Sequence, residues 1–300
     1  MKYTFGDIEV KCSSTDRVVF PEIGLTKGDV IEYYEEISEL ILPELEGRPI
    51  TVERYNKGLA GGGYFQKHIP KYYPKWIDRA QVRGKKTVNH AMCNKLADLV
   101  YMANQNSLTF HVPTAKADDL NAPDRLIFDL DPPPGRFDLV IEAARITRDL
   151  FAELGLPAYC KTTGSKGLHV VAPLDRSAPY REVHKLARQC ATLLAKRHPD
   201  TLTTEFYKKD RGERLYLDAE RNHGGATAVA AYTIRGRSNA PISVPIRWQE
   251  LDDPELSPDG IGVLQIEERL DQVGDLWADF AESAVALEPA IDAMAKLEPE

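Results

Sequence analysis

The segment Arg125–Asp131 constrains the fold of this chain more than any other, because it is predicted to be a core strand that ends in acidic residues. Its sequence, RLIFDLD, is apolar through Phe128 and is followed by three prolines and a glycine, which stop a strand. Alternate residues of a strand point to the same side, so Asp129 and Asp131 share one face about 7 Å apart. The chain must therefore place two carboxylates together at the exposed end of a buried strand.

Two neighbouring carboxylates repel each other unless a cation lies between them, and hard divalent cations prefer oxygen ligands. A second predicted strand, RLYLD at 214–218, also ends in an acidic residue, Asp218. If the two strand ends are neighbours, three carboxylates could hold two divalent ions for in-line displacement at phosphorus. The alternative is a surface strand of alternating charge, which a lone pair of aspartates leaves equally open.

The segment 162–169, TTGSKGLH, is predicted to be a tight loop that can bind phosphate. Its glycines let the backbone approach a ligand, and its hydroxyl groups, Lys166 and His169 can donate hydrogen bonds to phosphate oxygens. An ordinary glycine turn in a hairpin is the alternative. Arg235 follows another apolar segment, and a guanidinium group can bind phosphate through two parallel hydrogen bonds.

Hydrophobic periodicity predicts helices and strands that alternate along the chain, joined by several hairpin-length loops. Helices are expected over 27–45, capped by Thr26 with Asp29, and over 94–104, 137–154 and 180–197; strands are expected over 49–55, 107–112, 125–131, 158–162, 168–173, 203–207, 214–218 and 226–233. This order predicts an α/β (α+β) fold in which helices flank a mixed or antiparallel central sheet. We expect one domain over 1–300, with an acidic helical segment over 261–300.

The net charge of -8 counts against nucleic acid as a partner, but the charge is unevenly distributed. The segment 57–95 contains one acidic residue, Asp78, and the basic residues Lys57, Lys67, Lys71, Lys75, Arg79, Arg83, Lys85, Lys86 and Lys95. Such a region can be a phosphate-binding surface or merely a solvated charged face.

Cysteine usage and hydropathy exclude several other classes of protein. The four cysteines form no C-x-x-C pair, which argues against a zinc site or a disulfide framework and favours a reducing cytoplasm. The sequence lacks an apolar run of the roughly 20 residues that a membrane helix needs. We therefore expect a cytoplasmic protein without a membrane partner.

Taken together, these features resemble the polymerase domain of bacterial DNA ligase D, a branch of the archaeo-eukaryotic primase superfamily. The resemblance extends over about 15–251 and rests on six segments in the family's order: GLTKGDVIEYY (24–34), YFQKH (64–68), PDRLIFDLDPPPG (123–135), KTTGSKGLHV (161–170), RLYLDAERN (214–222) and ATAVAAYTIRGRSNAPISVPIRWQEL (226–251). It implies a primase-polymerase fold with a smaller N-terminal part.

The resemblance also implies a role for each motif residue. The catalytic carboxylates that bind two Mn²⁺ or Mg²⁺ ions would be Asp129, Asp131 and Asp218. The nucleotide-binding residues would be Ser165, Lys166, His169, Arg221, Arg235, His111 and Thr163, the last standing where the family more often has serine. Lys27 and Lys67 would bind the 5′-phosphate of a DNA end. The stretch Ala219–Arg221 departs from the family by lacking bulky apolar residues, which affects the expected sugar and base contacts.

The activity implied is addition of nucleotides, with ribonucleotides preferred, to DNA that carries a gap or 3′ overhang and a 5′-phosphate. The resemblance suggests gap filling in non-homologous end joining by a nucleoid-associated monomer, with Ku and a DNA ligase as partners. One alternative is a stand-alone primase that starts strands de novo, and another is a DNA-end-binding module without catalysis. A phosphatase of the haloacid dehalogenase type is disfavoured, because Pro132–Pro134 replace the hydroxyl residue expected after its D-x-D motif.

Overall fold

The computed structural model describes residues 1–84 and 86–297, and the chain divides into two compact units. The first contains Met1–Asp118, Thr227–Val244 and Ile261–Gln272; the second contains Asp119–Ala226, Pro245–Gly260 and the described residues from Val273 onward. The single domain expected over 1–300 remains a prediction. Lys85 of the basic segment and residues 298–300 of the expected C-terminal helical segment lie outside the described residues.

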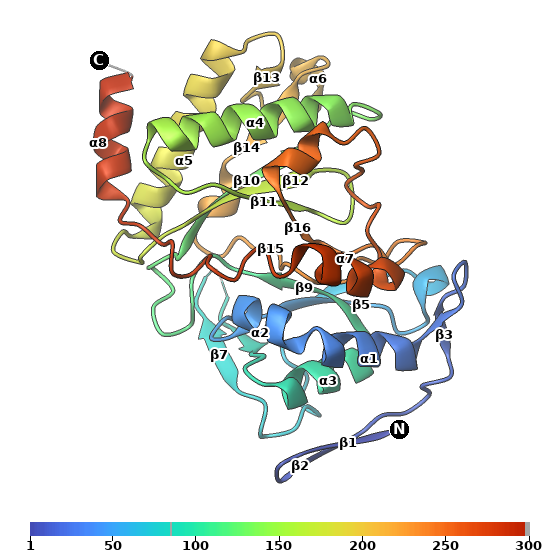
Figure 1. Ribbon diagram of the computed structural model, residues 1–300. Coiled ribbons are helices and arrows are strands. Elements are labelled where there is room, and N and C mark those ends of the chain that lie inside the picture. The colour runs from blue at the N-terminus through green and yellow to red at the C-terminus, as the bar shows by residue number, and fades with distance from the viewer. Residues whose placement is uncertain (85, 298–300) are drawn as a thin grey trace. The chain divides into compact units, whose positions relative to one another are not determined.

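The second unit is built on a six-stranded sheet in the order β13-β14-β10-β12-β11-β16 (Figure 1). The bounds are β10 Arg125–Asp131, β11 Tyr159–Thr162, β12 Leu168–Pro173, β13 Leu202–Thr203, β14 Leu215–Asp218 and β16 Pro245–Ile246. Neighbouring strands are antiparallel except β13 and β14, which are parallel. The expected mixed, largely antiparallel central sheet is therefore confirmed.

Helices pack on one face of this sheet and bury one set of alternating side chains. The helices of this unit are α4 (Phe137–Glu153), α5 (Tyr180–Arg197), α6 (Lys208–Arg211) and α8 (Glu288–Leu297), with short 3₁₀ turns η2 (Glu220–Asn222) and η3 (Trp248–Asp252). Leu126, Phe128 and Leu130 of β10 are fully buried in the core formed with α4, α5 and α8. Because side chains alternate along a strand, Asp129 and Asp131 point to the opposite face.

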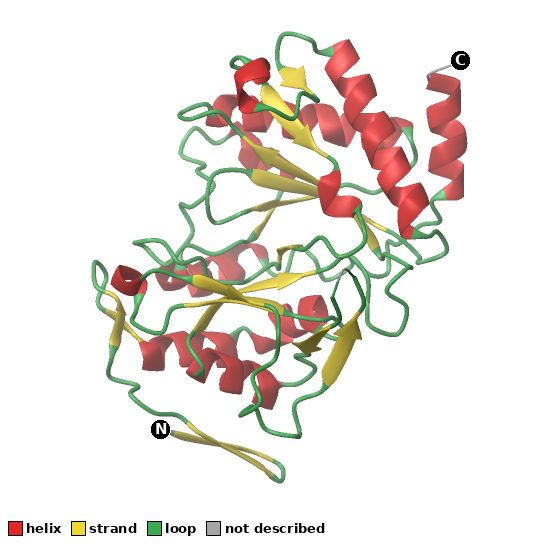
Figure 2. Cartoon of the chain, turned by 180° about the vertical axis from the view of Figure 1, so that it is seen from behind, coloured by secondary structure: helices red, strands yellow, loops and turns green. Residues whose placement is uncertain are grey.

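The first unit contains a four-stranded antiparallel sheet in the order β15-β9-β5-β6. Its strands are β5 Thr51–Arg54, β6 Tyr64–Gln66, β9 Ser107–Val112 and β15 Ala228–Val229; the strand pairs are β1 Lys2–Phe5 with β2 Ile8–Lys11, β3 Val18–Phe20 with β4 Leu25–Thr26, and β7 Arg79–Val82 with β8 Val88–Ala91. The helical segments are α1 Lys27–Glu36, α2 Ser38–Leu45, α3 Leu96–Asn104, η1 Leu59–Gly61 and η4 Val263–Gln265. The hairpin of β1 and β2 leads from the end marked N in Figure 2.

All four cysteines are buried as free thiols. Among the described residues, every helix is too short or too polar to cross a bilayer.

The predicted start of the first helix is confirmed, but its predicted length is wrong. The backbone N–H of Asp29 donates to Thr26 Oγ1 at 3.3 Å, and Asp29 Oδ2 accepts from the Thr26 N–H at 2.7 Å. This reciprocal capping fixes the first turn. At Ile37 the backbone leaves helical geometry, with φ of -90° and ψ of 13°, so the expected helix is divided into α1 and α2.

Two other expected elements are shorter than predicted. Of 203–207 only Thr203 lies in a strand, and Phe206 and Tyr207 are exposed. Of 226–233 only Ala228–Val229 is a strand, and Tyr232 has a positive φ of 62°, which a β-strand does not accommodate. Within its described residues, the expected helical segment over 261–300 contains the helices α7 (Ile266–Val273) and α8.

Asn222 holds the turn η2 against the central strand β10. Its buried side chain accepts a hydrogen bond from the Ile127 N–H at 2.8 Å and donates to the Ile127 carbonyl at 2.8 Å. It also donates to the Ala219 carbonyl at 3.0 Å. The pairing of β10 with β14 ends at Asp129 and Asp218, and the Asn222 amide supplies hydrogen-bond partners to the next backbone groups of β10, those of Ile127. The same bonds fix the turn η2 that follows β14.

We predict that Asn222→Ala destabilises the protein by on the order of 3 kcal/mol, because it leaves the buried N–H and C=O of Ile127 without these partners. Asn239→Ala, at an exposed position, is the control and should change stability by less than about 0.5 kcal/mol. Chemical denaturation of both variants measures the difference. Equal stabilities would show that the Asn222 side chain does not support the fold.

Candidate active site

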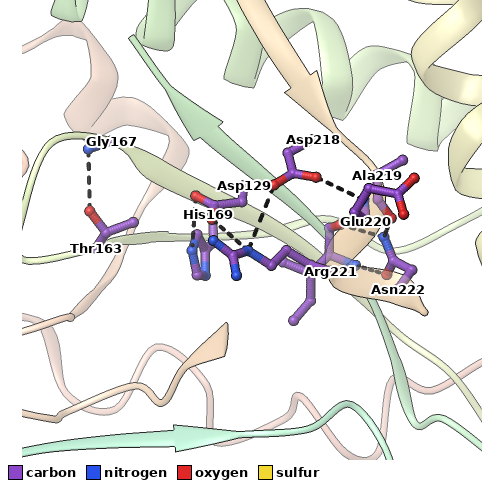
Figure 3. A network of polar contacts seen from close by, with 10 residues as sticks. Asp129, Thr163, Gly167, His169, Asp218, Ala219, Glu220, Arg221 and Asn222 are labelled. Carbon is purple, nitrogen blue, oxygen red and sulfur yellow. Dashed lines mark hydrogen bonds and ion pairs between the residues drawn. The ribbon is translucent and has the colours of Figure 1, made fainter. Parts of the chain in front are cut away.

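The centre of the site is a row of three polar side chains across three strands. Asp129 of β10 is paired with His169 of β12 on one side and with Asp218 of β14 on the other. Directly opposite residues of antiparallel strands point to the same face, so the three side chains gather there (Figure 3). His169 Nε2 lies 3.3 Å from Asp129 Oδ1. The expected adjacency of the two acidic strand ends is confirmed, although their role in metal binding remains a prediction.

Asp131 lies one step further along the same face, where β10 ends opposite Tyr216. Partial burial raises the pKa of the Asp131 carboxyl, and the negative charge of Asp129 raises it further. Burial also raises the pKa of Asp218, again with a contribution from Asp129. The three carboxylates therefore make a region of concentrated negative charge that favours a cation.

Arg221 supplies a positive charge to this region. Its Nε donates a hydrogen bond to Asp129 Oδ2 at 2.9 Å and lies 3.9 Å from Asp218 Oδ2 (Figure 3). The charge of Arg221 lowers the pKa of Asp131 and of Asp218, in opposition to burial. Arg221 thus lies among the carboxylates, and the nucleotide contact that the resemblance implies for it remains a prediction.

Asp129 and His169 have opposite charge preferences at neutral pH. Burial by itself raises the pKa of Asp129, but His169 and Arg221 hold it well below its usual range. Burial lowers the pKa of His169 to about 4, helped by the positive charge of Lys161 on the neighbouring strand and opposed by Asp129. At pH 7 the site thus contains an ionised Asp129 beside a neutral His169, whose Nε2 is placed to donate to the carboxylate.

The predicted phosphate-binding loop connects β11 to β12 and packs against the end of β10. The Thr163 N–H donates to the Gly167 carbonyl at 3.0 Å, and the Gly167 N–H donates to Thr163 Oγ1 at 3.2 Å. A Cβ on Gly167 would lie 1.9 Å from the Leu130 carbonyl oxygen, so only glycine permits this approach. Ser165 is half-buried and Lys166 is exposed. The positive charge of Lys166 opposes the rise in the pKa of Asp131 that burial and Asp129 cause.

The remaining predicted site residues lie in the first unit. Lys27 is buried, and its ammonium group donates to the Ser13 carbonyl at 2.6 Å. Lys67 follows β6 and is exposed. The ring of His111 lies 5.2 Å from that of Phe65 in an edge-to-face contact. The N–H of Arg235 donates to the Pro241 carbonyl at 2.7 Å, and the nucleic-acid and phosphate contacts expected of these residues remain predictions.

Sequence reasoning gave no role to Asn222 or Lys161, and it assigned Gly167 to the approach of a ligand, whereas this glycine approaches the Leu130 carbonyl. Lys161 is buried and lies directly opposite His169 in the pairing of β11 with β12. Alternation within the segment 158–162 places Lys161 on the same face of its strand as Tyr159, but the pairing with His169 depends on the register of the two strands. Gly167 stood directly before a predicted strand, which is where a close backbone approach can be suspected. The partner of Asn222, Ile127, lies 95 residues away in the sequence, so no local signal could identify it.

The site residues fit a divalent ion by their chemistry. Their clustered carboxylate oxygens are the donors that Mg²⁺ and Mn²⁺ prefer. In the described part of the chain, no three His, Cys, Asp or Glu side chains already lie in an arrangement that could hold a metal ion. The ion pair of Arg221 with Asp129 accounts for one carboxylate oxygen. Binding of an ion by all three carboxylates therefore requires local rearrangement.

Comparison with known proteins identifies several relatives of the same kind. The family model described as the primase-polymerase domain of LigD matches residues 26–277. The chain is 34% identical over 273 residues to the multifunctional non-homologous end joining protein LigD of Mycolicibacterium smegmatis, covering 90% of this chain and 36% of that protein. It is 30% identical over 276 residues to the bifunctional non-homologous end joining protein LigD of Bacillus subtilis, covering 91% of this chain and 44% of that protein.

A solved structure is also similar over nearly the whole chain. The polymerase domain from Mycobacterium tuberculosis ligase D, in complex with DNA, superposes with a TM-score of 0.85 at 31% identity, covering 92% of this chain and 99% of that one. The expected primase-polymerase fold is confirmed by this likeness. The chain spans about a third of the length of the mycobacterial relatives that it matches.

We predict that Gly167→Ala displaces the loop and destabilises the protein by about 1–3 kcal/mol, because its Cβ would overlap the Leu130 carbonyl. Gly224→Ala is a matched control, since its Cβ would meet its nearest neighbour, Tyr180 Cδ2, at 3.8 Å. Thermal denaturation compares the two variants. A Gly167 variant as stable as the Gly224 variant would contradict the close packing described here.

We predict that His169→Gln makes stability less dependent on pH between about 4 and 6.5. The pKa of His169 is lower in the folded chain, so the unfolded chain binds the proton first and wild-type stability falls as the pH falls through this window. The slope contributed by this one proton is at most about 1.4 kcal/mol per pH unit. Urea denaturation at several pH values measures it, and equal slopes in both proteins would refute the prediction.

Proposed function

The chain belongs to the LigD primase-polymerase domain family, and from that premise we propose that it is a metal-dependent nucleotidyltransferase that adds nucleotides to DNA ends. The observation that carries the proposal is the pairing of Asp129 with both His169 and Asp218, beside the Thr163–Gly167 loop. Carboxylates next to a loop with phosphate-binding chemistry are the elements that nucleotidyl transfer needs.

Asp129, Asp131 and Asp218 would hold the divalent ions, Mn²⁺ or Mg²⁺. When bound, such ions lower the pKa of a primer 3′-hydroxyl and balance the charge of the leaving pyrophosphate. His169 and Arg221 keep Asp129 ionised, so this ligand carries no proton that must leave at neutral pH. Burial raises the pKa values of Asp131 and Asp218, so these two carboxyl groups retain protons more readily than Asp129. A bound cation would favour their ionised forms, which are the forms that act as ligands.

The loop between β11 and β12 would bind the triphosphate. Lys166 is exposed at its tip and can neutralise phosphate charge, while Ser165 and Thr163 offer hydroxyl groups. Packing of Gly167 on Leu130 fixes the loop beside Asp131. His169, the second residue of β12, links this strand to Asp129 through its side chain. Most of the rate enhancement would then come from positioning and charge neutralisation.

The proposed substrates are nucleoside triphosphates, with ribonucleotides preferred, and DNA that has a gap or 3′ overhang and a 5′-phosphate. The solved relative in complex with DNA supports a DNA substrate, and the names of the relatives support a role in non-homologous end joining. Lys27 and Lys67 are the proposed 5′-phosphate ligands, and His111 and Arg235 are proposed nucleotide contacts. Ku and a DNA ligase are the proposed partners of a cytoplasmic, nucleoid-associated monomer.

The decisive experiment is extension of a labelled primer on gapped DNA with Mn²⁺ and each nucleotide type. We predict that wild type extends the primer and that Asp129→Ala or Asp218→Ala lowers the rate by about a thousandfold or more, because each removes a metal ligand. Asp149→Asn, an exposed residue of α4 paired with Arg148, should extend at the wild-type rate.

The other outcomes separate the alternatives. DNA binding without any extension would overturn the polymerase proposal and favour a non-catalytic end-binding module. Extension by all the aspartate variants would show that these carboxylates are not the catalytic ones. Synthesis on a template without a primer would add de novo primase activity to the proposed function.

A further inference from the structure

We infer that Arg221 is an internal counter-ion that occupies the carboxylate cluster and competes with the divalent ion for Asp129. The inference rests on the proposed function, since it concerns the metal site proposed there. It assigns to Arg221 a role beyond nucleotide contact: this side chain sets the affinity of the site for metal and stabilises the cluster when metal is scarce.

The geometry of the ion pair carries this inference. Arg221 Nε is 2.9 Å from Asp129 Oδ2, a distance typical of a charge-assisted hydrogen bond, and 3.9 Å from Asp218 Oδ2. A carboxylate oxygen has two lone pairs and can accept a hydrogen bond while it binds a cation, but here the guanidinium places its positive charge directly against the oxygen that the cation would bind. Asp129 Oδ1 is within 3.3 Å of His169 Nε2, so both oxygens of this carboxylate already have partners.

The backbone of Arg221 is fixed while its side chain can move. Asn222 ties the turn η2 to β10 through its hydrogen bonds with Ile127, so the Cα position of Arg221 is held beside the strand. The side chain of Arg221 is nevertheless 40% exposed, in contrast to 10% for Asp129. The guanidinium group can therefore turn toward solvent or a bound phosphate and release Asp129, without disruption of the turn.

The balance of charge gives the direction of the effect. Arg221 interacts with each of the three acidic groups, Asp129, Asp131 and Asp218. The positive charge of Lys166 in the loop lowers the pKa of Asp131, and that of Lys161 lowers the pKa of His169. Both lysines remain when Arg221 is replaced. Removal of the guanidinium leaves more negative charge and a free Asp129 oxygen, so a divalent ion binds more tightly.

The test measures Mn²⁺ binding directly, by the electron paramagnetic resonance signal of free Mn²⁺ in the absence of nucleotide and DNA. Arg221→Gln should lower the Kd for Mn²⁺ by about tenfold or more relative to wild type, whereas Arg221→Lys, which keeps the charge, should lower it less. Arg197→Gln is a matched control in the same unit. Arg197 pairs with Glu153 at 2.9 Å, away from the cluster, so its loss should leave the Kd within about twofold.

A measurement on the wild-type protein does not depend on whether these variants fold. The Nε–H of Arg221, assigned in nitrogen-15 spectra, should be protected from solvent exchange without metal and lose that protection at saturating Mg²⁺. Protection unchanged at Mg²⁺ saturation would overturn the inference, because the arginine would then keep its contact with Asp129 beside the ion.

The outcomes distinguish this inference from the proposed function. Equal or weaker Mn²⁺ binding by Arg221→Gln, with wild type active in primer extension, would overturn the competition and leave the polymerase intact. If the Asp129→Ala variant binds Mn²⁺ as tightly as wild type, both the proposed metal site and the inference are overturned. Tighter binding by Arg221→Gln, abolished when Asp129→Ala is added, would establish that the two side chains compete as inferred.

Discussion

The burial of a charged carboxylate in the middle of a sheet is the constraint on which the rest of the site depends. An ionised Asp129 that is only 7% exposed is costly unless it is paired and hydrogen-bonded. Two partners meet this requirement, His169 from β12 and Arg221 from the turn after β14. Their positions in turn require the antiparallel register of β10 with β12 and the attachment of Asn222 to Ile127. Strands and turn that are far apart in the sequence are thus held around one carboxylate.

The opposite face of the same strands explains why the register is secure. Leu130 pairs with Leu168 on one side and Leu217 on the other, and these leucines are buried in the core under the helices. A slip of one residue would move the leucines out of the core and the acidic side chains into it. The hydrophobic core therefore fixes the alignment of the polar row, and the site requires no separate device to hold its strands in place. Close packing of Gly167 on β10 adds the loop to this fixed frame.

The protonation states of the acidic side chains and of the histidine in the site are set by different local environments. Burial and Lys161 keep His169 neutral, while His169 and Arg221 keep Asp129 ionised. Asp131 and Asp218, without so close a cation, have raised pKa values and gain most from added positive charge. Groups with such divergent proton affinities in a small volume are typical of functional sites. The proposed phosphate chemistry and the competition between arginine and metal both follow from this arrangement.

Local pattern determined much of this protein. Periodicity predicted β9, β10, β12 and α5 with their observed bounds, because each is a strong alternating or helical segment flanked by clear stop signals. The sequence also placed Asp129 and Asp131 on one face and Thr26 at a helix start. It failed where a strand depends on its neighbours, as at 203–207, or where one backbone angle interrupts it, as at Tyr232. Only the tertiary structure decided that Asp129 faces Asp218, that Arg221 pairs with an aspartate 92 residues away, and that His169 is neutral, because strand order, ion pairing and burial arise from contacts between distant segments.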